Sequence, residues 1–196
     1  MKILAISGSP RKGGNTDKLL GIAIKVLESK GIETEFISLA GKNILTCTAC
    51  MACTKEPKCV LKDDFDPVFQ AMLDSDGFIV GSPVYFSSAT AEINALLDRA
   101  GYVAKNNGNL FRRKAGGPIA VARRIGQNFT LAQLLMWYMI NEMIVPGSSY
   151  WNIAFGSHSI DVLEDEEGVK TIRDFAENLA WLLDKIKGNN QGTNKR

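Results

Sequence analysis

The stretch that decides the fold runs from residue 2 to residue 16 and reads KILAISGSPRKGGNT. It begins as an unbroken apolar run and changes at residue 7 into a segment of serine, glycine and proline. Such a run is typical of a strand buried on both faces of a parallel sheet. Residues 16–30 then repeat apolar side chains on one helical face and end before Gly31, which favours a helix. The stretch therefore predicts a strand, a loop and a helix as the first unit of an α/β fold.

The same order of elements repeats along the chain. Strands are predicted at 2–6, 33–39, 77–80, 118–122 and 151–155, and helices at 16–30, 64–73, 91–100, 130–143 and 169–186. This alternation favours right-handed crossovers onto a five-stranded parallel sheet with helices on both faces, a three-layer sandwich of order 2-1-3-4-5. Ligands of such sheets bind beyond the carboxyl ends of the strands, where the direction of winding reverses.

Length and composition indicate the class of protein. A chain of 196 residues with 45% apolar and 22% charged residues can form one packed core. We expect a single domain over 1–187 with a cysteine-rich loop at 43–62, and a flexible tail at 188–196. The formal net charge is +2 with acidic and basic residues interspersed, which disfavours nucleic acid as a partner. Because the sequence shows neither a secretory leader nor a bilayer-spanning apolar run, we expect a cytoplasmic protein without a membrane partner.

The first of three loops at the predicted ligand edge, residues 7–16, favours an anion. It joins a buried strand to a helix N-terminus, where free N–H groups and the helix dipole attract negative charge. Both the P-loop motif and the dinucleotide motif are incomplete here, which favours a monophosphate such as that of flavin mononucleotide (FMN). The alternative is a glycine-rich connector with a capped helix. The candidate phosphate-binding residues are Ser9, Arg11, Gly14, Asn15 and Thr16.

The other two loops, 82–90 and 123–128, suit a flat heteroaromatic ring. The first carries two aromatic side chains and backbone amides at the end of a central strand, and the second brings positive charge that would stabilise an anionic reduced flavin. The alternatives are an aromatic plug at the sheet end and solvated surface arginines. The candidate ring-binding residues are Pro83, Val84, Tyr85, Phe86, Ser87, Arg123 and Gly126.

The chain resembles the flavodoxin-like NADPH-dependent FMN reductases and, within them, the iron-sulfur flavoproteins of anaerobic microbes. The motifs that carry the resemblance are GSPR at 8–11 with NT at 15–16, the cysteine segment followed by KDD at 62–64, GSPVYF at 81–86 and LDR at 97–99. The resemblance implies that the first loop holds the FMN phosphate and that the other two hold the isoalloxazine. We interpret Asp98 and Arg99 as a structural ion pair at a helix end.

Four cysteines stand in the spacing C-x2-C-x2-C-x5-C. Three close thiolates and a looser fourth suit a cubane cluster better than zinc, as in the related bacterial ferredoxin run. The resemblance strengthens this interpretation, because it implies a 4Fe-4S cluster. Zinc and free or disulfide-linked cysteines remain alternatives. The candidate ligands are Cys47, Cys50, Cys53 and Cys59.

The helix around 134–140 is apolar on almost every face, which predicts a subunit interface, or alternatively a deep core helix. The resemblance implies a homodimer or homotetramer. We assign no role to His158, the single histidine.

The sequence as a whole predicts a flavin-dependent oxidoreductase without a side-chain acid or base. Electrons would pass from a ferredoxin-like or NAD(P)H donor to a small-molecule acceptor. The alternatives are a cluster-free NAD(P)H-dependent FMN or quinone reductase, a flavodoxin-like electron carrier, and a regulatory zinc or redox module.

Overall fold

A five-stranded parallel sheet lies at the centre of the computed structural model, which describes residues 1–158 and 160–192. Its strands are β1 (Lys2–Ser7), β2 (Glu33–Ser38), β3 (Gly77–Pro83), β4 (Ala115–Ala122) and β5 (Ile153–Phe155). They lie in the order β2-β1-β3-β4-β5, and every neighbouring pair is parallel. The predicted strand order is therefore confirmed.

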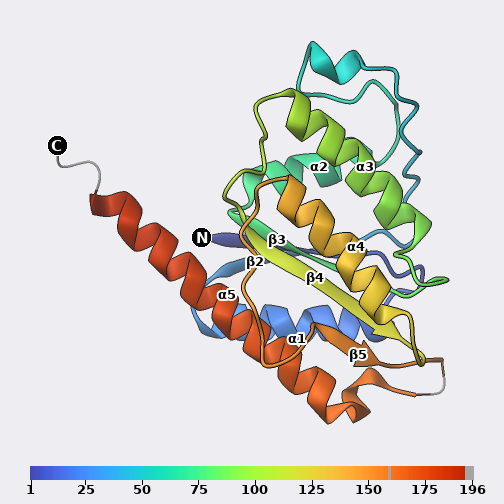
Figure 1. Cartoon of the computed structure of the whole chain (residues 1–196), viewed down its shortest axis with the longest axis vertical. Coiled ribbons are helices and arrows are strands. Elements are labelled where there is room, and N and C mark those ends of the chain that lie inside the picture. Colours follow the sequence, from blue (N-terminus) through green and yellow to red (C-terminus); the bar gives the residue numbers. More distant parts are fainter. Residues whose placement is uncertain (159, 193–196) are drawn as a thin grey trace.

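Helices cover both faces of the sheet (Figure 1). They are α1 (Asn15–Ser29), α2 (Phe65–Asp74), α3 (Ala91–Asn106), α4 (Gln127–Ile140) and α5 (Glu166–Gly192), with short 3-10 turns η1 (Ala52–Thr54) and η2 (Val162–Glu164). Helices α1 and α5 pack on one face, and α2, α3 and α4 pack on the other. The three layers match the predicted sandwich.

Strand β1 contributes side chains to the hydrophobic cores on both faces of the sheet. Leu4 and Ile6 point into the core beneath α2, α3 and α4, whereas Ile3 and Ala5 point toward α1 and α5. All four side chains are fully buried. Because neighbouring side chains of a strand point to opposite faces, a strand covered on both sides needs an unbroken apolar run.

Helix α3 is longer than predicted, because Gly101 does not end it. A Cβ atom at Gly101 would lie 3.0 Å from Nε1 of Trp137, so the glycine allows α4 to approach closely. The helix continues to Asn106 beside the cysteine-rich segment.

Helix α5 also exceeds its prediction. It continues to Gly192, so residues 188–192 are helical where a flexible tail was expected, and 193–196 lie outside the described residues. Among the helices of the described ranges, none is long and apolar enough to cross a bilayer.

Helix α4 has a buried and an exposed apolar face. Leu134 and Tyr138 are buried in the core, while Met136, Met139 and Ile140 are each 64–65% exposed. A deep core helix is therefore excluded, and an apolar stripe faces outward.

Candidate functional site

A cleft of about 880 Å³ lies beyond the carboxyl ends of the strands. Loops after β1, β3, β4 and β5 all contribute to its lining. Its volume falls within the range of roughly 300–1,000 Å³ that is usual for cofactor sites. The predicted site residues that line it are Ser9, Arg11, Gly14, Asn15, Thr16, Pro83, Val84, Tyr85 and Arg123.

The loop after β1 is ordered by its own hydrogen bonds. Asp17 accepts a bond of 2.7 Å from the backbone N–H of Gly13 and another from the Ser7 hydroxyl. The Ser9 hydroxyl oxygen accepts one of 3.1 Å from the backbone N–H of Arg11. The chain then enters α1 at Asn15, where the N–H groups of the first turn lack intrahelical acceptors. These groups face the cleft and can bind an anion.

Asn15 uses its side chain differently from the prediction. Its Nδ2 donates to the carbonyl oxygens of Ser157 and Ile160, both at 3.0 Å, and its Oδ1 accepts from the backbone N–H of Val162 at 3.2 Å. The amide therefore ties α1 to the loop after β5. What Asn15 offers an anion is its backbone N–H at the start of α1.

Basic side chains surround the cleft. Arg11, Lys12, Lys18 and Arg123 belong to its lining. Lys18 forms an ion pair with Asp161, and this hydrogen bond lowers the pKa of the Asp161 carboxyl. The remaining positive charge complements a phosphate and an anionic ring.

The loop after β3 is a tight hairpin. The backbone groups of Tyr85 and Ser88 pair at 2.9 and 3.0 Å, and Phe86 and Ser87 between them adopt positive φ angles of 50° and 63°. This turn directs Phe86 into solvent, fully exposed. Phe86 and Ser87 are therefore not among the cleft-lining residues, in contrast to the prediction.

Gly126 supports the hairpin and does not line the cleft. It has a φ of +95° at the start of α4, and a Cβ atom there would lie 2.9 Å from Oγ of Ser87 and 3.2 Å from Cγ1 of Val84. The position accepts only glycine without strain.

The sequence did not predict the fourth loop of the cleft. Gly156, Ser157, His158 and Ile160 line it after β5. The only available signal was a Gly/Ser-rich segment following the last predicted strand.

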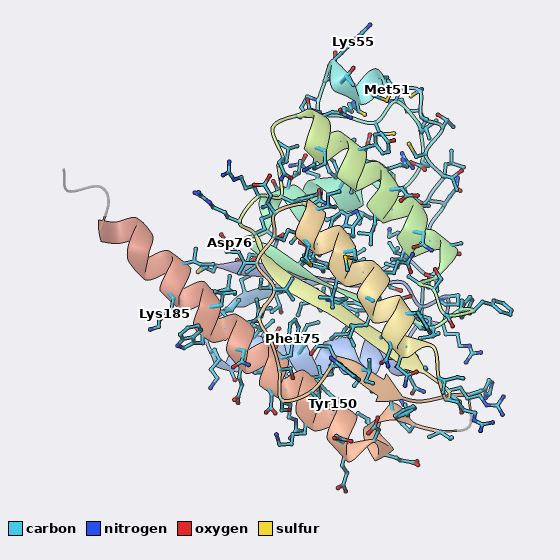
Figure 2. The ribbon with its side chains drawn as sticks, in the orientation of Figure 1. Met51, Lys55, Asp76, Tyr150, Phe175 and Lys185 are labelled. Carbon is cyan, nitrogen blue, oxygen red and sulfur yellow. The ribbon has the colours of Figure 1, made fainter. Side chains whose placement is uncertain are left out.

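The four cysteines are brought together at a second place. Cys47, Cys50, Cys53 and Cys59 line one cavity with Arg99, Tyr102 and Val103 of α3, and all four are free thiols. The loop lies on the outer side of α3, with Met51 and Lys55 at its tip (Figure 2).

The backbone of this loop turns sharply between the cysteines. Ala49 and Met51 have positive φ angles of 52° and 58°, although neither is glycine. These two turns reverse the chain direction on either side of Cys50. A backbone hydrogen bond from Ala52 lowers the pKa of the Cys50 thiol.

Arg99 pairs with Asp63, not with Asp98. Nη2 of Arg99 lies 3.0 Å from Oδ1 of Asp63, Nη1 contacts Oδ2, and the guanidinium stacks 4.1 Å from the centre of the Phe65 ring. The prediction of a helix-end pair with Asp98 was wrong, because burial selected a partner that lies 36 residues away in sequence.

The Arg99–Asp63 pair joins both ends of the cysteine loop to α3. Nη1 of Arg99 donates to the carbonyl oxygen of Leu45 at 3.1 Å, and the backbone N–H of Leu45 donates to Asp63 at 2.7 Å. The Arg99 side chain therefore holds residues 45 and 63, the two ends of the loop, against α3.

Within residues 1–158 and 160–192, no group of three or more His, Cys, Asp or Glu side chains is placed to hold a metal ion.

Comparison with known proteins places the chain in a family. The family model for NADPH-dependent FMN reductase matches residues 1–158. An iron-sulfur flavoprotein of Methanocaldococcus jannaschii is 38% identical over 194 residues, covering 95% of this chain and 100% of that protein. One from Methanosarcina thermophila is 35% identical over 192 residues, covering 96% and 98%.

Solved structures show the same fold. RosB with a bound riboflavin-phosphate intermediate has a TM-score of 0.78 at 16% identity, covering 96% of this chain and 81% of RosB. The flavodoxin WrbA-like protein from Agrobacterium tumefaciens has a TM-score of 0.64 at 11% identity, covering 94% and 97%. The fold is therefore flavodoxin-like. The chain belongs to the NADPH-dependent FMN reductase family of flavin-dependent oxidoreductases, and it groups there with the proteins named iron-sulfur flavoproteins.

Proposed function

We propose that this flavin-dependent oxidoreductase binds a 4Fe-4S cluster on Cys47, Cys50, Cys53 and Cys59, accepts electrons from a ferredoxin-like donor and reduces a small acceptor at FMN. The observation that carries the proposal is that all four cysteines of the chain line one cavity against α3. The names of the similar proteins support it.

The cleft residues fit FMN. The N–H groups at the start of α1 and the Arg11 guanidinium would hold the phosphate, while Pro83, Val84 and Tyr85 would contact the ring. FMN supplies the electron and hydride transfer, and the protein provides binding, orientation and charge. Arg123 at the rim would stabilise negative charge on the ring by fixed electrostatics.

The donor set of the cysteine loop fits a cluster better than zinc. Four thiolates suit both. The preference for a cluster rests on the C-x2-C-x2-C-x5-C spacing and on the names of the similar proteins.

The surface around the cysteines suits an acidic electron carrier. Lys55, Lys58 and Lys62 are exposed on the same loop. Positive charge at the point of electron entry would guide an acidic partner and make its association sensitive to salt. This favours a protein donor for the cluster.

Direct hydride transfer from NAD(P)H to FMN is the second candidate. The basic rim of the cleft favours it, because Lys12 and Arg123 could contact a nucleotide phosphate. In that case the cysteines would not be needed for reduction of the flavin.

Anaerobic stopped-flow reduction separates the two candidates. The wild-type protein should be reduced quickly by a reduced ferredoxin, and Cys59→Ser should lose iron and this reaction. Glu56→Gln, an exposed change in the same loop, should keep both. If iron-free Cys59→Ser is reduced by NADPH as fast as the wild type is by ferredoxin, the flavin needs no cluster for its reduction, and the second candidate is correct.

A further inference from the structure

Helix α3 presents a polar face to the cysteine loop. Arg99 and Tyr102 line the same cavity as the four cysteines. Asn106 follows Arg99 by about two helical turns, so both side chains lie on the same face of the helix. The cysteines therefore rest against a surface that offers N–H donors.

Asn106 donates a hydrogen bond to a cysteine sulfur. Its Nδ2 lies 3.7 Å from Sγ of Cys53 and 2.9 Å from the carbonyl oxygen of Tyr102. The next side chain, Asn107, donates to the carbonyl oxygen of Cys53 at 2.8 Å. Two adjacent amides thus fix Cys53, one at its sulfur and the other at its backbone.

Arg99 has an N–H group that its ion pair does not use. Of its five N–H donors, those on Nη1 and Nη2 serve Leu45 and Asp63. Its Nε is buried and has no hydrogen-bond acceptor within the described part of the chain. Since buried donors are rarely left without an acceptor, the site implies a further group beside it.

The acceptors that share a cavity with Arg99 are cysteine sulfurs. The cavity is lined by Cys47, Cys50, Cys53 and Cys59 together with Arg99. A sulfur of this set is therefore the candidate acceptor for the unused N–H group.

We propose that Asn106 and Arg99 are positioning residues for the cluster. Asn106 donates an N–H···S hydrogen bond to Cys53, Arg99 donates one from Nε to another cysteine sulfur of the same cavity, and both bonds raise the reduction potential of the cluster. The inference rests on the proposed function. Hydrogen bonds to ligand sulfurs stabilise added negative charge, so they favour the form that carries one more electron. Uptake of that electron makes and breaks no covalent bond.

A redox titration followed by electron paramagnetic resonance tests the proposal on anaerobically purified holoprotein. Asn106→Leu removes the donor at an exposed position and should lower the reduced-to-oxidised ratio of the cluster about three- to tenfold at fixed ambient potential. For a one-electron centre this corresponds to about 30–59 mV. Asn106→Gln keeps an N–H donor, so its reduced-to-oxidised ratio should stay close to that of the wild type.

The matched control is Lys105→Gln. Lys105 is an exposed cation beside Asn106 whose Nζ donates to the carbonyl oxygen of Ile140, away from the cysteines. Its replacement should change the ratio less than twofold. Arg99→Lys keeps the charge but loses the Nε donor, and it should lower the potential and the iron content while FMN is retained.

The possible outcomes are distinct. If the wild type and the Asn106 variants hold a cluster of equal potential, the inference is wrong and the proposed function stands. If the wild type holds no cluster, both are wrong. Should Arg99→Lys fail to fold, the Asn106 pair still decides the question.

Discussion

Arg99 of α3 and Asp63 at the end of the cysteine loop form an ion pair in which both side chains are at most 1% exposed. The pair also binds the backbone of Leu45 at the start of the loop. A loop with exposed residues along most of its length is thus closed at its base by one buried contact. The cysteine site depends on this closure.

Replacing Asp63 with asparagine should strongly destabilise the protein. Removing one partner leaves the Arg99 charge buried without compensation, which costs about 3–5 kcal/mol. Urea unfolding at neutral pH measures the loss. Asp98→Asn is the control, because the Asp98 carboxyl is not part of the pair and burial raises its pKa. It should change the free energy of unfolding by less than about 0.5 kcal/mol, and an equal loss in both variants would refute the assignment.

The stabilising effect of Asp63 should disappear in acid. Burial opposes its charge, but Arg99 and the backbone N–H groups of Leu45 and Phe65 lower its pKa below the ordinary 3.8. A depressed folded-state pKa gives stability that is complete above the ordinary value and is lost as the pH falls toward the folded value. The difference in unfolding free energy between the wild type and Asp63→Asn should therefore narrow below pH 3.8. A constant difference would contradict this.

Two neighbouring aromatic residues should differ in their effect on FMN binding. Tyr85 lines the cleft, whereas Phe86 is fully exposed on the outer side of the hairpin. Loss of a ring contact is worth about 0.5–1.5 kcal/mol, so Tyr85→Ala should raise the Kd for FMN about two- to tenfold. Fluorescence titration of the apoprotein measures this. Phe86→Ala should leave the Kd unchanged, and the reverse result would show that the hairpin binds the ring by its outer side.

The outward face of α4 should mediate self-association. Phe129, Met136 and Ile140 are exposed along one side of the helix, at 72%, 64% and 64%. Exposed apolar surface of this kind marks interfaces. Light scattering should show an oligomer for the wild type and a lower mass for Met136→Lys. The control Lys25→Gln changes an exposed position on α1 and should leave the mass unchanged. A monomeric wild type would refute the prediction.

The sequence predicted the sheet order well, because its information is local. Unbroken apolar runs such as 2–6 report burial on both faces, and the right-handed crossover rule leaves few topologies. The same reasoning found the loops after β1, β3 and β4. Helix ends were less accurate, since Gly101 carries a packing role that only the position of Trp137 reveals.

Side-chain partners depend on contacts distant in sequence. Asp98 adjoins Arg99 in sequence, but the side chains of adjacent helical residues do not face each other. The fold instead brings Asp63 to the buried guanidinium of Arg99. Asn15 looked like a phosphate donor, but its amide is used by the loop after β5. Neither contact has a signature in the local sequence.

Chemical analysis of anaerobically purified protein tests the central claim most directly. Iron, acid-labile sulfide, zinc and FMN are measured together with a visible spectrum. We predict about four iron and about four sulfide per chain with about one FMN, and a broad shoulder that bleaches with dithionite. FMN without iron and sulfide, or zinc in place of iron, would contradict the account.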